Sequence, residues 1–312
     1  MAHPLETHDR LNLGAAVFLA KASQAAYSED ASADAWAKSE GFPGGVKSFS
    51  RENVQGFWAV QGQIALLALR GTQSTAHWIR NLTLAPSNHQ WGRVHLGFHD
   101  GIVDVEPDMQ EFIGAARNAR FVWVTGHSLG GALALIAAAR LKMSGISSTT
   151  YTYGQPKMCF SNFADRFASE LPGRYVRFVN QNDIVPRVPP FYVHFGNLKR
   201  IVRPGVLESF SLESAAAAPD PVTRPQLAAA KATIEASVME SAVAIAASGI
   251  DKPLVIDSEL PPLTNQQFLE LKIALEADAG LEGAGLEFAL PSFKDHGIAN
   301  YITLLTQIRD QS

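Results

Sequence analysis

The sequence is poor in the features that mark several classes of protein. Its 312 residues contain one cysteine, Cys159, which excludes an internal disulfide framework and a zinc site built from cysteines. The net charge of −4 argues against a nucleic-acid-binding protein, which needs a basic surface. The chain has no run of about 18 apolar residues, and its N-terminus lacks the basic start of a Sec-type signal peptide. The default expectation is a soluble cytoplasmic protein, with export by a non-classical route left open.

Aromatic residues are missing from one long segment. Between Ser211 and Gln267 there is no Phe, Trp or Tyr, which is unusual for a stretch inside a core. Residues 214–225, SAAAAPDPVTRP, are typical of a linker, and the pattern then predicts a long helix at 226–248. Thr264 is a candidate N-cap for another helix. We predict a main domain formed by residues 1–205 and 290–312, with a helical insertion at 206–289 that is a candidate cap.

In the remaining chain, segments with strand patterns alternate with segments with helix patterns. The alternation predicts the α/β class, with a mainly parallel central sheet flanked by helices. The predicted helices span 11–27, 104–118, 131–142 and 162–170, and the predicted strands span 57–60, 64–69, 120–125, 149–153, 174–180 and 191–202.

The motif Gly126-His127-Ser128-Leu129-Gly130 joins a buried strand directly to an Ala/Leu-rich helix. A turn this sharp forces the serine into a strained conformation, which is tolerable only when neighbouring residues lack side chains. Gly126 and Gly130 meet that need. The serine hydroxyl then stands free at the N-terminus of a helix, where developing negative charge is favoured. Ser128 is therefore the candidate nucleophile, and a glycine-rich turn with an idle serine is the alternative.

A serine nucleophile needs a base, and the base needs an acid to orient it. His194 and His296 follow a plausible acid in the sequence, and His296 is favoured because it lies at a loop-to-helix edge. His194 lies inside a strand-like run, where a structural role is simpler. Asp183 is the candidate acid, because it follows a predicted strand at the edge where parallel sheets place their sites.

The oxyanion of a tetrahedral intermediate needs hydrogen-bond donors. The backbone N–H of Leu129, directly after the nucleophile, is one candidate. Thr72, in the Arg70-Gly71-Thr72 run that ends a predicted strand, is the second, through its N–H and its hydroxyl. An ordinary turn at the strand end is the alternative for Thr72.

Four segments together resemble the class 3 lipases, the fungal-type triacylglycerol lipase family. They are ALRGTQSTAHWIRNL, VTGHSLGGALA, FVNQNDIVPRVP and DHGIANYI. The resemblance implies an α/β-hydrolase fold, with the oxyanion residue at Thr72, the nucleophile at Ser128, the acid at Asp183 and the base at His296. It also implies a mobile lid after Thr72, where Trp78, Ile79, Leu82 and Leu84 are lid or acyl-pocket candidates. A packed surface loop is the alternative for this stretch.

The sequence predicts a serine carboxylester hydrolase, a lipase or esterase that cleaves acylglycerol esters through an acyl-enzyme. The expected partner is a lipid or another small ester, with transient contact to a lipid surface, and no cofactor or metal is expected. His95 and His99, four residues apart, lack a third metal ligand nearby. A phospholipase A1, a feruloyl-type esterase, an acyltransferase or a non-catalytic lipase-like binding protein are the alternatives, because function resides in the pocket and not in the fold. The oligomeric state is left open.

Overall fold

The architecture is taken from a computed structural model. It describes residues 3–7, 11–52, 54–72, 74, 78–79, 81–180, 183–202, 254–256, 263–269, 271–272 and 295–311. The helices are α1 (Leu13–Ala25), α2 (Asp30–Ser39), α4 (Leu96–Asp104), α5 (Glu106–Ala116), α6 (Leu129–Met143), α7 (Ser161–Glu170), α12 (Ile298–Gln311) and the short 3-10 helix η1 (Val185–Arg187). The strands are β1 (Lys47–Arg51), β2 (Val54–Gln61), β3 (Ile64–Leu69), β4 (Pro86–His89), β5 (Gly92–His95), β6 (Phe121–His127), β7 (Thr149–Tyr153), β8 (Tyr175–Asn180), β9 (Asn197–Val202) and β10 (Leu254–Ile256).

The central sheet has the strand order β1-β2-β3-β6-β7-β8-β9-β10. Strands β3, β6, β7, β8 and β9 are parallel to one another, whereas β1, β2 and β10 are antiparallel to their neighbours. The carboxyl ends of the parallel strands therefore share one edge of the sheet. Strands β4 and β5 form a separate antiparallel pair.

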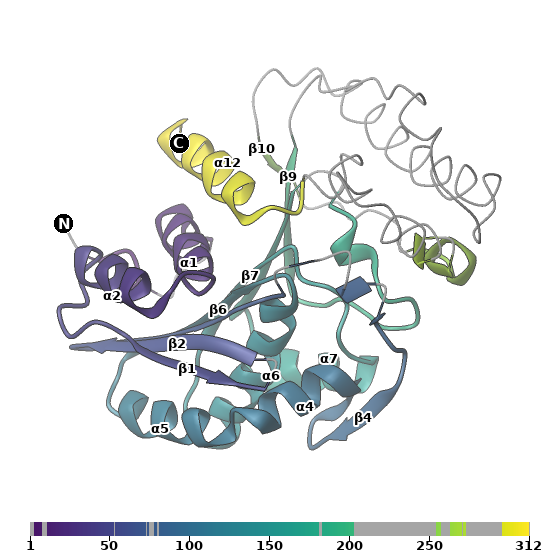
Figure 1. Ribbon diagram of the computed structural model, residues 1–312, viewed down its shortest axis with the longest axis horizontal. Coiled ribbons are helices and arrows are strands. Elements are labelled where there is room, and N and C mark those ends of the chain that lie inside the picture. Colours follow the sequence, from purple (N-terminus) through teal and green to yellow (C-terminus); the bar gives the residue numbers. More distant parts are fainter. Residues whose placement is uncertain are drawn as a thin grey trace.

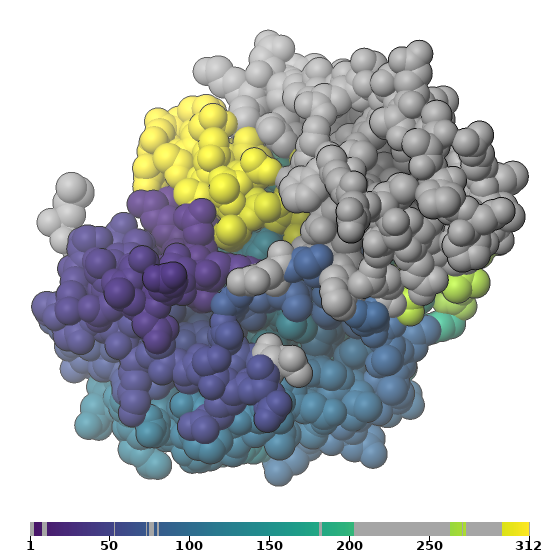
Figure 2. Space-filling view, viewed as in Figure 1, coloured from purple at the N-terminus to yellow at the C-terminus, as the bar shows by residue number. Residues whose placement is uncertain are grey.

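Helices cover both faces of this sheet (Figure 1). One core joins the sheet to α4, α5, α6 and α7, and a second core joins the opposite face to α1, α2 and α12. Helix α6 is apolar all round, as expected for a helix packed between a sheet and other helices. In the space-filling view, the yellow C-terminal helix α12 lies against the purple N-terminal helices (Figure 2).

The predicted α/β architecture is confirmed, and most predicted elements lie within two residues of the observed ones. The expected strand at 191–202 is wrong in its first half, because β9 begins only at Asn197. Phe191 and Gly196 adopt positive φ angles of 69° and 78°, and these left-handed residues interrupt the extended backbone. Helices α2 and α4, strand β1 and the pair β4–β5 were not predicted from the sequence. Within the described residues, no helix is long and apolar enough to cross a membrane.

The expected insertion is described only in part, and the predicted linker at 214–225 and helix at 226–248 lie outside the described residues. Residues 254–256 form β10, which pairs with β9 and extends the main sheet, so the segment is not exclusively helical. Thr264 caps a helical stretch: its Oγ1 accepts from the Gln267 N–H at 3.2 Å, and the Gln267 side chain accepts from the Thr264 N–H at 2.9 Å. The division into main domain and insertion stays a prediction.

Candidate active site

Ser128 lies at the point where β6 ends and α6 begins. Its φ and ψ angles are 57° and −131°, which is the strained backbone expected at this turn. The Ser128 N–H donates to the Tyr153 carbonyl at 2.9 Å, which ties the turn to the end of the adjacent strand β7. The Ser128 Oγ is buried and has no hydrogen-bond partner among the described residues. A hydroxyl in this state is free to react when the site admits a substrate.

Glycines make the sharp turn at Ser128 possible. A Cβ atom at Gly126 would collide with the backbone of Gly130, and a Cβ atom at Gly130 would collide with the Leu69 carbonyl. The strand, the turn and the first turn of α6 therefore pack backbone against backbone. Any side chain at Gly126 or Gly130 would push the helix off the sheet and move Ser128.

Asp183 and His296 form a buried pair 113 residues apart in sequence. The Nδ1 atom of His296 lies 3.0 Å from Oδ1 and 2.9 Å from Oδ2 of Asp183. The Asp183 carboxylate also accepts from the Tyr301 hydroxyl at 2.7 Å and from the Val185 N–H at 2.9 Å. These donors compensate for the burial of a carboxylate that is 0% exposed. The opposite ring nitrogen, Nε2 of His296, is buried and finds no partner in the described part of the chain.

Several contacts place this pair beside the serine. Gly154 directly follows Tyr153, whose carbonyl accepts from the Ser128 N–H. A Cβ atom at Gly154 would lie 2.8 Å from Nδ1 of His296. The ring of His127, the residue before the serine, lies 4.5 Å from the His296 ring, centroid to centroid. The structure thus brings the three candidate triad residues to the carboxyl edge of the parallel strands. Their assignment as nucleophile, base and acid is developed below as a proposal.

The loop after β3 packs directly on the nucleophile turn. A Cβ atom at Gly71 would lie 2.7 Å from the His127 carbonyl oxygen and 3.1 Å from the Ser128 Cβ. Thr72, the next residue, has a buried Oγ1 for which the described residues offer no hydrogen-bond partner. Thr72 and Leu129 also line the same pocket. The geometry therefore allows the donors of Thr72 and Leu129 to converge on one oxygen.

That pocket has a volume of ≈ 540 Å³, which is within the usual range for a small-molecule site. Its wall is largely apolar and includes Trp78 and Phe98, whose rings stack at 6.2 Å. Of the four lid and acyl-pocket candidates, Trp78 and Leu82 line it. Ile79 is fully buried, Leu84 is 40% exposed, and neither lies in the pocket wall.

The described end of the insertion touches the same region. The Lys272 ammonium donates to the Leu82 carbonyl at 3.3 Å, and the Leu263 N–H donates to the Arg187 carbonyl at 3.3 Å. Residues 263–272 therefore contact both the lid candidate and the segment that follows Asp183. The assignment of the insertion as a cap stays a prediction, and the predicted helix at 226–248 lies outside the described residues.

The histidines set aside at the sequence level have structural partners. His194 Nε2 lies 2.7 Å from the Pro186 carbonyl, and burial lowers its pKa well below the usual value. His95 and His99 turn to different partners, the Thr83 carbonyl at 2.7 Å and the Ser87 hydroxyl at 3.0 Å. Among the described residues, no cluster of three or more metal-ligating side chains occurs.

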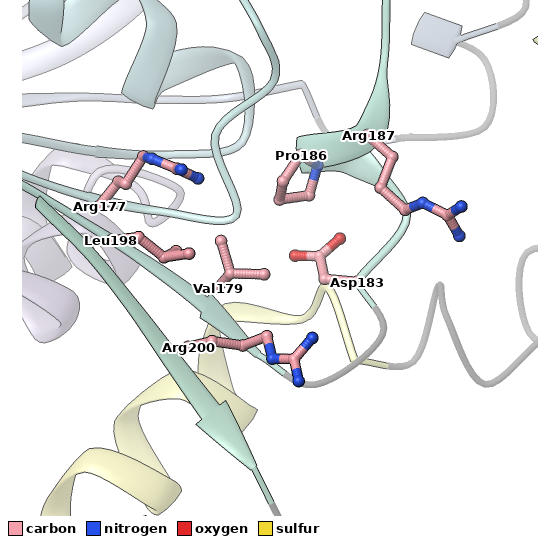
Figure 3. A pocket seen from close by; sticks show the side chains of 7 residues that line it. All are labelled: Arg177, Val179, Asp183, Pro186, Arg187, Leu198 and Arg200. Atoms are coloured by element: carbon pink, nitrogen blue, oxygen red, sulfur yellow. The ribbon is translucent and has the colours of Figure 1, made fainter. Parts of the chain in front are cut away.

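A small cavity of ≈ 10 Å³ lies on another side of Asp183, enough for about one water molecule. Arg177, Arg187 and Arg200 line it together with Asp183 (Figure 3), and all three arginines are buried. The Asp183 carboxylate and three buried arginines thus border the same small cavity.

Sequence reasoning missed the residues that support this site. The Tyr301 hydroxyl donates to the Asp183 carboxylate. Asn180 Nδ2 donates at 2.8 Å to the carbonyl of Asp295, the residue before His296. His95 and Phe98 line the pocket. Asn180 and Tyr301 lie in two of the segments that carry the family resemblance, but their roles could not be assigned because each depends on contacts between distant segments.

A parallel sheet with helices on both faces and a serine turn, a histidine and an aspartate at its carboxyl edge define the α/β-hydrolase class. Residues 66–193 match the family described as Lipase (class 3). This part of the chain, from β3 to the segment after Asp183, is therefore similar to the class 3 lipases.

Two of the similar proteins are named as lipases. The chain is 35% identical over 132 residues to secreted mono- and diacylglycerol lipase 1 of Fusarium solani, covering 40% of this chain and 39% of that protein. It is 37% identical over 136 residues to a lipase of Rhizomucor miehei, covering 40% and 37%. The alignment thus spans about two-fifths of the length of these curated relatives.

Solved structures share the fold. The structure of MDLA from Penicillium cyclopium superposes with a TM-score of 0.54 at 26% identity, covering 65% of this chain and 83% of that one. A triacylglycerol lipase, described as having a serine protease triad at its catalytic centre, superposes with a TM-score of 0.51 at 26% identity, covering 61% and 80%.

Proposed function

We propose that this protein is a serine carboxylester hydrolase, a lipase or esterase that cleaves acylglycerol esters. The observation that carries the proposal is the buried Asp183–His296 pair beside Ser128, with the outer nitrogen of the histidine and the serine oxygen both without partners among the described residues. Other histidines, such as His194, also leave one buried ring nitrogen without a described partner, so the distinguishing feature of His296 is that its Nδ1 pairs with a buried carboxylate beside a serine. The names of the matched relatives point to the same chemistry.

The proposed reaction follows from the positions of these groups. Ser128 Oγ attacks the ester carbonyl carbon while His296 Nε2 takes its proton, and the carbonyl oxygen becomes an oxyanion. The N–H groups of Thr72 and Leu129 donate to that oxyanion. When the carbon–oxygen bond of the ester breaks, His296 returns the proton to the leaving alcohol. A water molecule then loses a proton to His296 and attacks the acyl carbon. The bond between that carbon and Ser128 Oγ breaks, His296 returns the proton to Oγ, and the acid is released.

Asp183 keeps the imidazole in the reactive orientation. Because its carboxylate accepts from Nδ1, the proton of the neutral ring resides there, and Nε2 is left as an acceptor that can take the serine proton. The carboxylate also stabilises the imidazolium that forms after proton transfer. Tyr301 and the Val185 N–H fix the carboxylate itself.

The substrate proposed is an acylglycerol whose acyl chain occupies the pocket beside Thr72 and Leu129. The stacked rings of Trp78 and Phe98 give this pocket an apolar wall, which suits a hydrocarbon chain. Ser128 is 1% exposed and His296 3% exposed, so the site is covered in this structure. Segments over the pocket must therefore move to admit a substrate, and contact with a lipid surface would favour that opening.

Two measurements test the proposal. A fluorophosphonate probe should label the native protein, and prior substitution Ser128→Ala should abolish the labelling. A protein that no probe labels would be a lipase-like binding protein instead. Hydrolysis of p-nitrophenyl esters of graded chain length, with phospholipid and feruloyl esters alongside, then identifies the substrate class. Preference for phospholipid or feruloyl esters over acylglycerols would replace the proposed substrate.

A further inference from the structure

The loop that carries His296 is held to the sheet at two consecutive carbonyl groups. Asn180, the last residue of β8, donates from Nδ2 to the Asp295 carbonyl at 2.8 Å. His127, the last residue of β6, lies with its Nε2 2.6 Å from the His296 carbonyl. The ends of β6 and β8 thus hold the backbone of the candidate base.

The contacts of His127 determine which of its ring nitrogens carries the proton. A carbonyl oxygen can only accept, so Nε2 of His127 must be the donor to His296. Burial, with the neighbouring His296, lowers the pKa of His127 well below its usual value, so the ring is neutral and its Nδ1 is an acceptor. The Tyr27 hydroxyl, 3.0 Å from Nδ1, is then the donor to it.

Tyr27 connects this chain of hydrogen bonds to the loop that carries Thr72. Its hydroxyl lies against Gly71, at a point where any Cβ atom would collide with it. Burial raises the pKa of Tyr27 well above its usual value, while the Gly71 backbone and the Arg70 guanidinium act in the opposite direction. The phenol therefore keeps its proton and can donate it to His127 over the whole neutral range.

We propose that Tyr27 and His127 are positioning residues of the active site: Tyr27 holds the His127 ring at Nδ1, and His127 fixes the backbone of His296 beside Ser128. The inference rests on the proposed hydrolase function, since it assigns His296 as the base. His127 does not touch the substrate in this account. It acts through the His296 carbonyl and through its own ring, which packs on the His296 ring at 34° between planes.

The chain of hydrogen bonds from Tyr27 through His127 to the His296 carbonyl, called the relay below, predicts an order of effects on kcat. His127→Phe keeps a flat ring but removes the donor to the His296 carbonyl. If His296 then shifts by about 1 Å, kcat should fall by roughly 10- to 100-fold. His127→Gln places an amide N–H near the position of Nε2 and should recover kcat to within about 3-fold of the wild type. Tyr27→Phe leaves His127 without its donor, and one lost hydrogen bond corresponds to a decrease of roughly 3- to 10-fold. KM should stay within about 2-fold throughout, because none of these groups lines the acyl pocket.

Tyr151→Phe is the matched control for Tyr27→Phe. The Tyr151 hydroxyl is also buried against the sheet, but it accepts from the Asn12 N–H at 3.3 Å and has no contact with His127. This control should leave kcat unchanged. Should His127→Phe fail to fold, the comparison of Tyr27→Phe with Tyr151→Phe still tests the relay.

The ¹⁵N chemical shifts of His127 test the relay independently of any activity. They should show an unprotonated Nδ1 and a protonated Nε2 in the native protein, and a shifted Nδ1 resonance in Tyr27→Phe, where Nδ1 has lost its donor. The relay is overturned if Nδ1 carries the proton in the native protein, if His127→Phe keeps kcat within 2-fold, or if His127→Gln is no better than His127→Phe. A native protein that shows the expected shifts and hydrolyses no ester would instead contradict the proposed function alone.

Discussion

A Cβ atom added at Gly154 would lie 2.6 Å from Oδ2 of Asp183, at the point where the acid meets the base. Gly154 has a φ of +56°, and its N–H donates to the Phe178 carbonyl at 3.0 Å, so the backbone has little room to retreat. The absence of a side chain here is a structural requirement of the Asp183–His296 pair. The strand end that holds Ser128 also leaves space for the two residues that would activate it.

Gly154→Ala should therefore separate the pair. The added methyl must displace Asp183 or His296, and a misplaced base lowers kcat by roughly 100-fold. Gly173→Ala is the control, because Gly173 also has a positive φ, +71°, but its Cβ would meet nothing within 4 Å. Both variants carry the backbone strain, and only Gly154→Ala should lose activity in an ester hydrolysis assay. Equal losses would mean that strain alone, and not the clash, matters.

Asp183→Asn should lower kcat by about 10⁴-fold with a smaller effect on KM, because an amide N–H facing His296 selects the wrong tautomer. Tyr301→Phe is a milder test of the same carboxylate, since it removes one of its donors. The loss of kcat in Tyr301→Phe should be smaller than the loss in Asp183→Asn by a factor of at least about ten. An Asp183→Asn variant with more than about a tenth of the native kcat would remove Asp183 from the triad.

The chemistry-bearing positions could be predicted from the sequence because each is marked by its own local pattern. Ser128 stands in a glycine-rich strand-to-helix turn, Asp183 follows a strand, and His296 precedes a helix. The structure places all three at one edge of the sheet, although their roles stay a proposal. Tyr27 and His127 could not be connected in the same way, because their hydrogen bond spans 100 residues and depends on how α1 packs on β6.

The errors in the fold have equally local causes. Phe191 to Phe195 has the composition of a strand, but composition does not reveal the positive φ angles of Phe191 and Gly196 that bound the segment. Strand β10 was missed because Leu254-Val255-Ile256 is only three residues long and lies in a region predicted to be helical. Its pairing with β9 is a long-range contact that no local pattern encodes.

Acid should destabilise the fold through buried histidines. Burial lowers the pKa of His127 and His194 well below 6.5 and that of His89 to about 4. Below about pH 6.5 the unfolded chain binds protons that the folded chain does not, so the free energy of unfolding falls as the pH falls from 6.5 towards 4. Urea unfolding at pH 7 and at pH 5 measures this difference.

His194→Gln is the variant that isolates one contribution to this pH dependence. The glutamine amide can still donate to the Pro186 carbonyl, but it does not titrate. The variant should therefore lose less stability than the native protein between pH 7 and pH 5. An unchanged difference would show that His194 is not protonated on unfolding in this range.

Trp78 should contribute more to the hydrolysis of esters with long acyl chains than to that of esters with short ones. Trp78→Ala removes one of the two stacked rings in the pocket wall and should lower kcat/KM for a p-nitrophenyl palmitate several-fold more than for the butyrate. Trp58→Ala is the control, because Trp58 packs on Phe112 in the core and not in the pocket. If both tryptophan variants affect the two esters equally, the effect is on stability and the pocket assignment fails.

The rate of hydrolysis of a simple ester by Ser128→Ala tests the central claim most directly. The account predicts that kcat falls by roughly 10⁴- to 10⁶-fold, because only the oxyanion donors and substrate binding remain. The fold should survive, since the substitution removes one oxygen that bonds to no described residue. A variant that folds and keeps more than about a tenth of the native kcat/KM would show that Ser128 is not the nucleophile.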